Sequence, residues 1–359
     1  MSKAHYIIPI FVPHQGCPFH CVFCNQRKIS GANGCIDIEQ TAINIEKYLK
    51  TIRKPYEQHV EIAFYGGSFT GIDPCIQKEL LTLAYQWKKT GMIRDIRIST
   101  RPDYIDKWIM EFLQEYGVSI IELGVQSMDD EVLNASGRGH TSQEVKKAVQ
   151  LIRQFQVQIG LQLMLGLPKD NLSKAESSAE ECIRLKPDFV RIYPTLVIKD
   201  TPLESMWREG RYHPLSLEEA IAMSKRILLK FVKNDIPVIR IGLQPTENIL
   251  EGKDVISGPF HPAFRQCVEA QIYRDMLEKV CQDYGIYGIK KVEIEIHDRY
   301  LSSLVGIRRS NIEFLSQKYK IAAIRILRNN SPRNTEFRLN IGRDMKIHYD
   351  MKKYAEHVM

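Results

Sequence analysis

The sequence lacks long hydrophobic runs, a recognisable leader, and any repeated or low-complexity segment. A membrane-spanning helix needs about 20 consecutive, mostly apolar residues, and no stretch of these 359 residues approaches that length. The opening residues, MSKAHYIIPIFVPHQG, carry no secretory cleavage pattern. We therefore expect a cytoplasmic protein with no membrane partner.

Cysteine is sparse outside one short segment. Five of the eight cysteines stand alone in otherwise ordinary segments, at Cys35, Cys75, Cys182, Cys267 and Cys281. Secreted disulfide frameworks are denser and more regular than this. Small buried thiols are common in protein cores, so we assign these five residues no function.

An excess of negative charge is also missing. The formal net charge is +7, and residues 286–359 carry all of it, with 15 Lys and Arg against 8 Asp and Glu. The preceding residues balance at 35 against 35. A basic tail on a neutral body is typical of a module that binds a polyanion such as RNA, although a solvated basic surface has the same composition.

From residue 6 to about residue 243, short β-branched runs alternate with longer amphipathic segments. This alternation predicts repeated βα units around a parallel sheet. Helix candidates with apolar residues near i, i+3, i+4 and i+7 separate the strands. The six strand candidates are 6–12, 60–66, 95–100, 118–126, 158–167 and 188–194. The predicted fold class is α/β, with a partial (β/α)6 barrel.

The segment GCPFHCVFCNQ directly follows the first predicted strand. It places Cys17, Cys21 and Cys24 in the spacing C-x3-C-x2-C, at the strand end where βα folds collect their chemistry. Three thiolates can hold a 4Fe-4S cluster and leave one iron open for a ligand. The same cysteines could instead hold structural zinc, with His14 or His20 as the fourth ligand.

The cysteine spacing, with Phe23 before the last cysteine, resembles the signature of the radical S-adenosylmethionine (radical SAM) superfamily. The resemblance covers residues 6 to about 245. It implies a radical SAM barrel whose cofactors are a 4Fe-4S cluster, held by the three cysteines, and S-adenosylmethionine. In that superfamily the open iron chelates S-adenosylmethionine. An electron from an external donor of the flavodoxin or ferredoxin type then cleaves it to a 5′-deoxyadenosyl radical.

Further motifs resemble cofactor contacts in the same superfamily: FYGGSFTG, STRPD, GVQS, SGRGHT and QLMLGLP follow in the same order. Glycines let a backbone approach a ligand closely, and an arginine can fork onto a carboxylate. We place Tyr193 near the substrate as the one candidate catalytic residue. The resemblance assigns cofactor binding to Phe23, Gly66, Gly67, Ser68, Arg101, Gln126, Arg138 and Leu163.

Six motifs together resemble the radical subunit of Elongator, the tRNA-modifying acetyltransferase, and its shorter bacterial relatives. They are GGSFTG, STRPDYI, ELGVQSM, SGRGHT, LMLGLP and RIYPTLVIKDTPLESMWREGRY. Here, however, the cysteine spacing is the short form and there is no room for an acetyltransferase domain, so we do not expect acetyl transfer. The short spacing and Gln126 also resemble anaerobic coproporphyrinogen dehydrogenase, which makes porphyrin chemistry the alternative among enzymes.

Proline and glycine cluster between residues 245 and 262 and predict a connection. We expect the radical SAM core over residues 1–255 and a small basic α+β domain over residues 256–359. In the latter, loop, helix and strand resemble a KH module, whose GXXG loop clamps a nucleic-acid backbone. The loop would start at Gly306. It lacks the second glycine, but Arg308 and Arg309 could contact phosphates. A helix and strand that pack against the barrel are the structural alternative.

Two hypotheses of different class follow from these features. The first is a radical SAM enzyme that acts on RNA, with tRNA as the favoured substrate and the basic tail as its docking surface. The second is a non-catalytic RNA-binding protein in which the cysteines hold zinc. The sequence identifies neither the hydrogen atom that is abstracted nor the oligomeric state.

Overall fold

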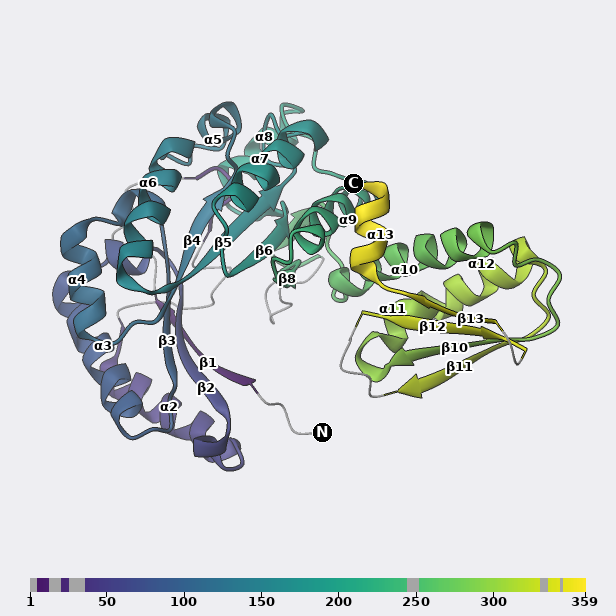
Figure 1. Cartoon of the computed structure of the whole chain (residues 1–359). Coiled ribbons are helices and arrows are strands. Elements are labelled where there is room, and N and C mark those ends of the chain that lie inside the picture. The colour runs from purple at the N-terminus through teal and green to yellow at the C-terminus, as the bar shows by residue number, and fades with distance from the viewer. Residues whose placement is uncertain (1–4, 13–20, 26–35, 244–251, 330–334, 343–344) are drawn as a thin grey trace. The chain divides into compact units, whose positions relative to one another are not determined.

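A computed structural model describes residues 5–12, 21–25, 36–243, 252–329, 335–342 and 345–359. The chain divides into two compact units (Figure 1). The first comprises Met1–Leu215 and Leu243–Phe260, and the second comprises Ser216–Gly242 and His261–Met359. No helix among the described residues is long and apolar enough to cross a membrane.

The main sheet has seven strands in the order β1-β2-β3-β4-β5-β6-β8. Adjacent strands from β1 to β6 pair in parallel, and their spatial order follows the chain, as in a (β/α) barrel, where each strand pairs with the next. This arrangement confirms the predicted α/β partial barrel. The strands are β1 (His5–Val12), β2 (His59–Gly66), β3 (Asp95–Thr100), β4 (Ile120–Gln126), β5 (Gln158–Leu165), β6 (Phe189–Pro194) and β8 (Val238–Ile241).

Six helices of the first unit lie on the outer, convex side of the curved sheet (Figure 1). Each begins after an Asp, Asn or Thr whose side chain accepts a hydrogen bond from a backbone N–H of the first turn, which is the usual way to start a helix. They are α2 (Ile38–Thr51), α3 (Pro74–Lys89), α4 (Lys107–Glu115), α5 (Asp130–Ala135), α6 (Ser142–Ile152) and α7 (Leu172–Arg184).

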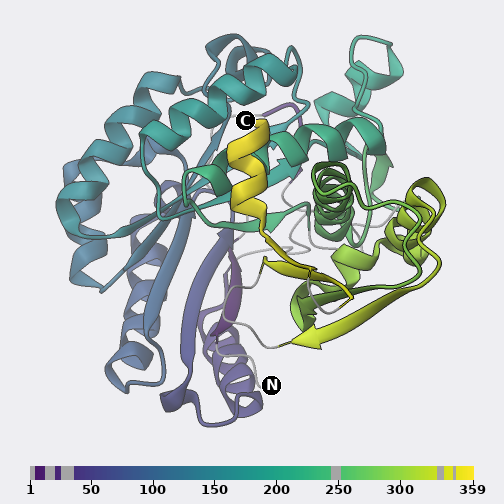
Figure 2. The same ribbon diagram turned by 45° about the vertical axis from the view of Figure 1, so that its right-hand side comes forward.

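The two faces of this sheet differ in chemistry because side chains alternate along each strand. Val60, Ile62 and Phe64 of β2 are fully buried on the helix-covered face. The concave face instead carries Glu61 and Tyr65 of the same strand, together with polar side chains from β3 to β6. Figure 2 shows β1 at the edge of the sheet. The apolar core of this unit therefore lies between strands and helices, and the polar residues face the concave side.

A short antiparallel ribbon, β7 (Val197–Ile198) and β9 (Val255–Ser257), follows the sixth strand, with α8 (Pro202–Arg208) after β7. Val197, Leu203 and Tyr212 form a buried apolar cluster there, and Val22 and Phe23 of the cysteine segment pack against it. The predicted cofactor residue Phe23 thus helps to anchor this segment to the end of the barrel.

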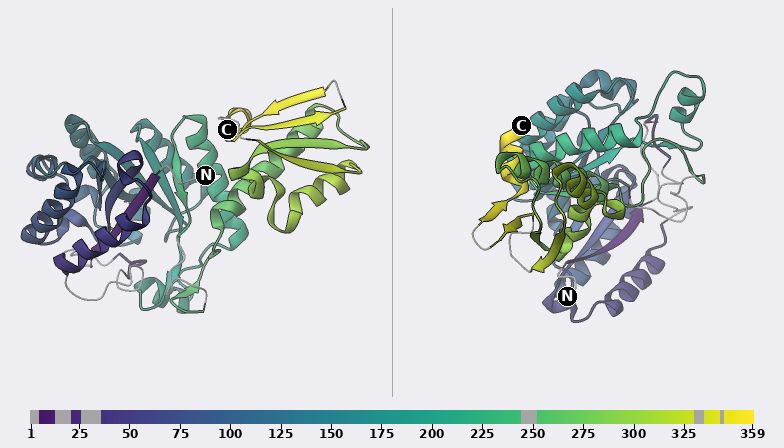
Figure 3. Two further views of the ribbon diagram at one scale, coloured as in Figure 1. Left: turned by 90° about the horizontal axis from the view of Figure 1, so that it is seen from below. Right: turned by 90° about the vertical axis from the view of Figure 1, so that its right-hand side faces the viewer.

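The second unit contains a four-stranded sheet in the order β11-β10-β12-β13. β10 and β11 pair in parallel, whereas β12 pairs antiparallel with both β10 and β13. Figures 1 and 3 show α10 and α12 on one face of this sheet. The strands are β10 (Val292–His297), β11 (Ile324–Asn329), β12 (Phe337–Ile341) and β13 (Met345–Tyr349). The helices are α9 (Leu217–Lys233), α10 (Phe264–Asp283), α11 (Leu301–Val305), α12 (Ser310–Tyr319) and α13 (Met351–Val358).

The predicted boundary near residue 255 lies within Leu243–Phe260, which groups with the first unit. Ser216–Gly242, assigned from sequence to the barrel core, groups by contact with the C-terminal elements. The predicted division into one domain over residues 1–255 and another over residues 256–359 therefore stays a prediction. The helix and strand expected after the Gly306 loop are present as α12 and β11.

A tight turn separates α11 from α12 at the residues compared above with a KH loop. Gly306 has φ 79°, and a Cβ there would lie 2.6 Å from Ser310 Oγ. Arg308 and Arg309 are exposed and also adopt left-handed backbone, with φ 51° and 67°. The buried Asn311 amide donates to the Ala270 carbonyl at 2.8 Å and fixes the start of α12. Left-handed backbone at two consecutive arginines costs conformational free energy.

Candidate functional site

The described part of the cysteine segment, residues 21–25, is fastened at both sides to the carboxyl end of the barrel. Cys24 N donates to Cys21 O at 3.0 Å, which makes a tight turn between the two cysteines. Val22 N donates to Ser136 O at 3.0 Å, and Leu203 N donates to Val22 O at 2.8 Å. Cys17, and the alternative zinc ligands His14 and His20, lie outside the described residues.

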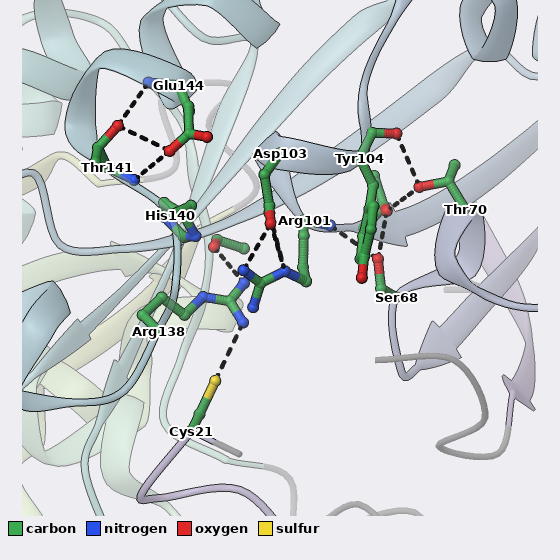
Figure 4. Close-up of polar contacts among 12 residues, drawn as sticks. Cys21, Ser68, Thr70, Arg101, Asp103, Tyr104, Arg138, His140, Thr141 and Glu144 are labelled. Carbon is green, nitrogen blue, oxygen red and sulfur yellow. Dashed lines mark hydrogen bonds and ion pairs between the residues drawn. The ribbon is translucent and has the colours of Figure 1, made fainter. Parts of the chain in front are cut away.

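Arg138 links the cysteine segment to the fourth strand (Figure 4). Its Nη1 lies 3.6 Å from Cys21 Sγ, and its Nη2 donates to Gly124 O at 2.7 Å. The guanidinium is buried, and its Nε has no hydrogen-bond partner among the described residues. A buried donor without a partner is costly, so this nitrogen is available to a bound anion.

His140 lies two residues further along, beneath the same group of side chains. It is buried, and its Nε2 lies 3.2 Å from Val125 O. Burial, together with the charges of Arg138 and Arg101, lowers the pKa of His140 to about 3. The imidazole is therefore neutral at physiological pH, and its Nδ1 has no partner within the described part of the chain.

Gly66, the last residue of β2, and Gly67 after it both lie against the end of β1. Gly66 has φ 109°, and a Cβ there would lie 2.5 Å from Val12 O, so the close neighbour is the end of β1. Gly67 N donates to that same Val12 carbonyl at 3.3 Å. These contacts bring the end of β1, where the cysteine segment starts, against the glycine-rich turn, and the prediction that the glycines contact a cofactor stays open.

Ser68 and Arg101 come from neighbouring strand ends and meet through Thr100. Ser68 Oγ lies 2.7 Å from Thr100 Oγ1 and accepts from Arg101 N at 3.2 Å. The buried Arg101 guanidinium forks onto Asp103, with Nε–Oδ1 at 2.9 Å and Nη2–Oδ2 at 2.8 Å. Asp103 was not singled out from sequence, although its position in the STRPD motif was the available signal.

Gln126 ends β4 in a left-handed conformation, with φ 67°, where the β4–β5 register shifts. Its Oε1 accepts from Gln162 Nε2 at 3.2 Å, so its amide lies with the concave-face side chains. Leu163 follows Gln162 on β5, is fully buried, and points to the opposite face of the strand. The structure thus brings Gln126, but not Leu163, to the concave side.

Tyr193 lies at the end of β6 within a polar network that sequence reasoning missed. Arg191 Nη1 donates to Tyr193 OH at 3.3 Å, and Arg191 Nη2 donates to Tyr65 OH at 2.8 Å. Burial raises the pKa of Tyr65 to about 12, despite the nearby Arg191. Arg191 also pairs with Glu122 at 2.9 Å.

The network continues toward the amino ends of the strands through buried charges. Arg97 pairs with Glu122 and forks onto Glu61, with Nε–Oε2 at 2.6 Å and Nη2–Oε1 at 3.0 Å. We call Glu61, Arg97, Glu122 and Arg191 the charge ladder. Each is an ionisable residue within a strand whose other residues are mostly apolar. A charged residue in such a strand is the sequence feature from which these four could have been predicted.

The geometry at the carboxyl ends can be tested for its fit to a cluster and an amino-acid-like ligand. Cys21 and Cys24 offer two thiols from one turn, and Arg138 offers a buried cationic donor beside them. The unpartnered Nε of Arg138 matches a carboxylate. The described residues therefore fit an open iron-sulfur cluster with an anionic ligand next to it.

Two family models match this chain. The Radical SAM superfamily model matches residues 11–182, and the Radical_SAM C-terminal domain model matches residues 187–274. The chain belongs to the radical SAM superfamily. It is a radical SAM enzyme, and its cofactors are those of the superfamily, a 4Fe-4S cluster and S-adenosylmethionine.

The curated relatives include proteins named for tRNA modification. The tRNA uridine(34) acetyltransferase of Methanocaldococcus jannaschii is 36% identical over 151 residues, which are 39% of this chain and 28% of that protein. The protein of the same name from Dehalococcoides mccartyi is 28% identical over 247 residues, 62% of this chain and 53% of that protein. Elongator complex protein 3 of Homo sapiens is 33% identical over 136 residues, 37% of this chain and 25% of that protein. This radical SAM chain thus spans about half or less of the length of these relatives.

A solved structure agrees with the fold. The archaeal Elp3 of Methanocaldococcus infernus, with an N-terminal deletion, superimposes with a TM-score of 0.58 at 22% identity. The match covers 79% of this radical SAM chain and 64% of that one. It confirms the radical SAM half-barrel with a further C-terminal part.

Proposed function

We propose that this radical SAM enzyme acts on RNA, with tRNA as the substrate class. The observation that carries the radical chemistry of the proposal is Arg138, a buried cation that touches Cys21 and keeps one donor without a partner in the described chain. The relatives named for tRNA modification support the choice of RNA. Acetyl transfer is not part of the proposal, since the relatives share only part of their length with this chain.

In this proposal Cys17, Cys21 and Cys24 hold the cluster, and Arg138 donates to the carboxylate of S-adenosylmethionine. When bound, the two cofactors supply a 5′-deoxyadenosyl radical through one-electron reduction by a flavodoxin- or ferredoxin-type donor. The neutral His140 lies behind Arg138 and adds no second charge to the site. A location in the cytoplasm, where such donors occur, belongs to the same proposal.

Three further cofactor and substrate residues belong to the ends of three strands, β2, β4 and β6. Ser68, fixed by Thr100, and Gln126, fixed by Gln162, present polar groups at the carboxyl edge. Tyr193 would face the substrate from β6, with its hydroxyl held by Arg191. Because Arg191 is itself held by Glu122, Tyr193 is a positioned hydroxyl that can donate to a substrate oxygen or nitrogen.

For RNA docking we propose the exposed arginines of the turn before α12. Arg308 and Arg309 lie next to each other in left-handed backbone, so their side chains start from a fixed turn. Removal of one arginine that binds a phosphate should lower the slope of log affinity against log salt by about one.

The test begins with anaerobic reconstitution of the full chain with iron and sulfide. S-adenosylmethionine and dithionite are then added, and 5′-deoxyadenosine is measured by mass spectrometry with and without bulk tRNA. We expect release that rises several-fold with tRNA. Release stimulated by a porphyrinogen and not by tRNA would overturn the substrate and favour the porphyrin alternative.

Matched cysteine variants separate the cluster from other thiols. Cys24→Ala should abolish the brown colour and the release of 5′-deoxyadenosine, whereas Cys75→Ala, which removes an exposed thiol on α3, should change neither. The assignment of the cysteines to a cluster would be contradicted if the wild type were colourless and contained zinc, and if it bound tRNA no better than Cys24→Ala.

The docking surface is tested separately by RNA binding. The double variant Arg308→Gln, Arg309→Gln should lower the salt slope by about two. Lys107→Gln, at a side chain that is 80% exposed on α4, is the control that removes one cation away from this turn, and it should leave the slope closer to that of the wild type. Equal slopes in all three proteins would remove the turn from the proposal.

A further inference from the structure

Two histidines and a glutamate meet at the amino ends of β1 and β2. His5 and His59 are register partners on the neighbouring parallel strands, and their rings lie 4.6 Å apart, edge to face. Glu61 follows His59 by two residues, so its side chain lies on the same concave face. The ligand atoms of these three residues all lie within 4.8 Å of one another.

The carboxylate of this group is fixed before any ligand arrives. Glu61 is fully buried, and both of its oxygens accept hydrogen bonds from Arg97. Arg97 is itself held by Glu122. A ligating carboxylate whose orientation is set by a second layer of hydrogen bonds is the usual arrangement around metals in proteins.

The histidines, by contrast, are half exposed and can adjust. The His5 side chain is 49% exposed and the His59 side chain is 40% exposed. His5 Nε2 contacts Glu61 Oε1, and His59 Nε2 lies 2.9 Å from Asp95 Oδ2. Asp95 is oriented by Ser119, whose Oγ donates to Asp95 Oδ1 at 2.6 Å. Asp95 therefore stands beside the group as a fourth donor.

We propose that His5, His59 and Glu61 bind a divalent cation of the zinc class. Two imidazole nitrogens with a carboxylate oxygen suit such ions, and no thiolate is needed. Ligands about 2.0–2.2 Å from zinc do not touch one another, so His5 Nε2 has to move back from Glu61 Oε1 and His59 Nε2 has to turn toward the same point. Rotation of the two exposed imidazoles achieves this while Glu61 stays in place. Asp95 or water completes the coordination.

This site is independent of the cluster. The cysteine segment follows the carboxyl end of β1, whereas His5 starts that strand. The cation would replace the proton that His5 shares with Glu61 and the one that His59 shares with Asp95. It would join the edge strand β1 to β2 by a metal bridge in addition to their backbone ladder.

The test uses the reconstituted full chain and zinc as the probe. Protein with a measured iron and sulfide content is incubated with zinc, desalted, and analysed for metal content. We expect the wild type to retain about one zinc ion per chain at this site, in addition to any zinc on the cysteines. Its melting temperature should rise by a few degrees when zinc is added. His59→Gln, and separately His5→Gln, should lose that one ion and the shift.

His213→Gln, which removes an exposed imidazole elsewhere in the first unit, is the matched control and should retain the zinc. The variants change exposed side chains, so equal melting temperatures without zinc would show that they fold alike. Cobalt added to the same proteins gives a second readout, since visible d–d absorption should appear in wild type and His213→Gln alone. Equal zinc retention in wild type and both ligand variants, or binding at surplus zinc only, would overturn the proposal.

Discussion

The charge ladder in the middle of the concave face and Arg138 at its carboxyl edge handle buried charge in opposite ways. In the middle, every member of the charge ladder has an oppositely charged partner: Arg97 bridges Glu61 and Glu122, and Glu122 also holds Arg191. At the edge, Arg138 is equally buried but rests on a neutral carbonyl and a thiol. Its Nε and His140 Nδ1 have no partners among the residues that the structure describes. Arg191 Nε is also without a partner there, but Arg191 keeps the Glu122 carboxylate beside it.

The difference separates architecture from chemistry. A buried network in which charges compensate each other stabilises one arrangement of the strands. A buried cation with an unused donor has unmet electrostatic and hydrogen-bonding capacity, which a ligand can satisfy. Residues of the same type, Arg97 and Arg138, thus predict opposite mutational outcomes.

The largest effect should come from breaking the ladder. Arg97→Met would leave Glu61 and Glu122 buried without their shared cation, and we expect a loss of about 3–5 kcal/mol in the free energy of unfolding. Urea titration with circular dichroism measures it. A loss below about 1 kcal/mol would mean that the ladder is solvated and that the comparison fails.

Arg138→Met should have the reverse profile. It removes the hydrogen bond to Gly124 O and the weaker contact with Cys21 Sγ, so we expect a stability loss of only about 1 kcal/mol. The dissociation constant for S-adenosylmethionine should rise by about 10- to 100-fold, because a charge-assisted bond to the carboxylate is removed. Anaerobic calorimetry on reconstituted protein measures it, and Arg138→Lys should recover only part of the affinity. Unchanged affinity with a large stability loss would place Arg138 with the ladder.

Because of His140, we expect the stability of the fold to decrease at acidic pH. Its pKa is depressed to about 3 in the folded chain, against an ordinary value of about 6.5. Its stabilising contribution is therefore complete above pH 6.5 and is lost as the pH falls toward 3. Between pH 7.5 and pH 5 the loss should be about 2 kcal/mol.

In His140→Gln this part of the pH dependence should vanish, because the amide does not titrate. Denaturant titrations at both pH values measure the difference, with His213→Gln as the exposed control. A pH dependence in His140→Gln as steep as that of the wild type would show that His140 is not the group responsible.

The smallest effect should come from a charge pair at the surface. Arg325 of β11 lies 3.5 Å from Glu293 of β10, and its side chain is 63% exposed. Arg325→Met should leave the free energy of unfolding unchanged within the error of the titration, because exposed ion pairs contribute little. The same urea titration measures this variant, which is the control for Arg97→Met. If Arg325→Met lowered the free energy of unfolding as much as Arg97→Met does, buried and exposed ion pairs would not differ here.

The sequence predicted the strands well because buried parallel strands are short apolar runs with regular spacing. The helices between these strands were equally clear, because their apolar residues recur every three or four positions. The short elements α5, α11, β13 and α13 were not predicted, since five to eight residues give too little periodicity to distinguish them from loops.

The site was predicted as a set of motifs but not as a geometry. Arg138 and Cys21 lie 117 positions apart in the chain, and their contact depends on how two strand ends come together. The pairing of Arg101 with Asp103 and the opposite-face placement of Leu163 depend on side-chain direction. A sequence motif alone does not give that direction.

The position of β1 also bears on how the enzyme is assembled. Among the described strands of the main sheet, β1 pairs only with β2, so releasing it breaks one ladder and leaves the rest of the sheet paired. Local opening of an edge element costs less free energy than global unfolding. The segment that carries the cysteines follows directly from this strand, so a local opening of β1 would displace that segment while the strands from β2 to β6 stay paired.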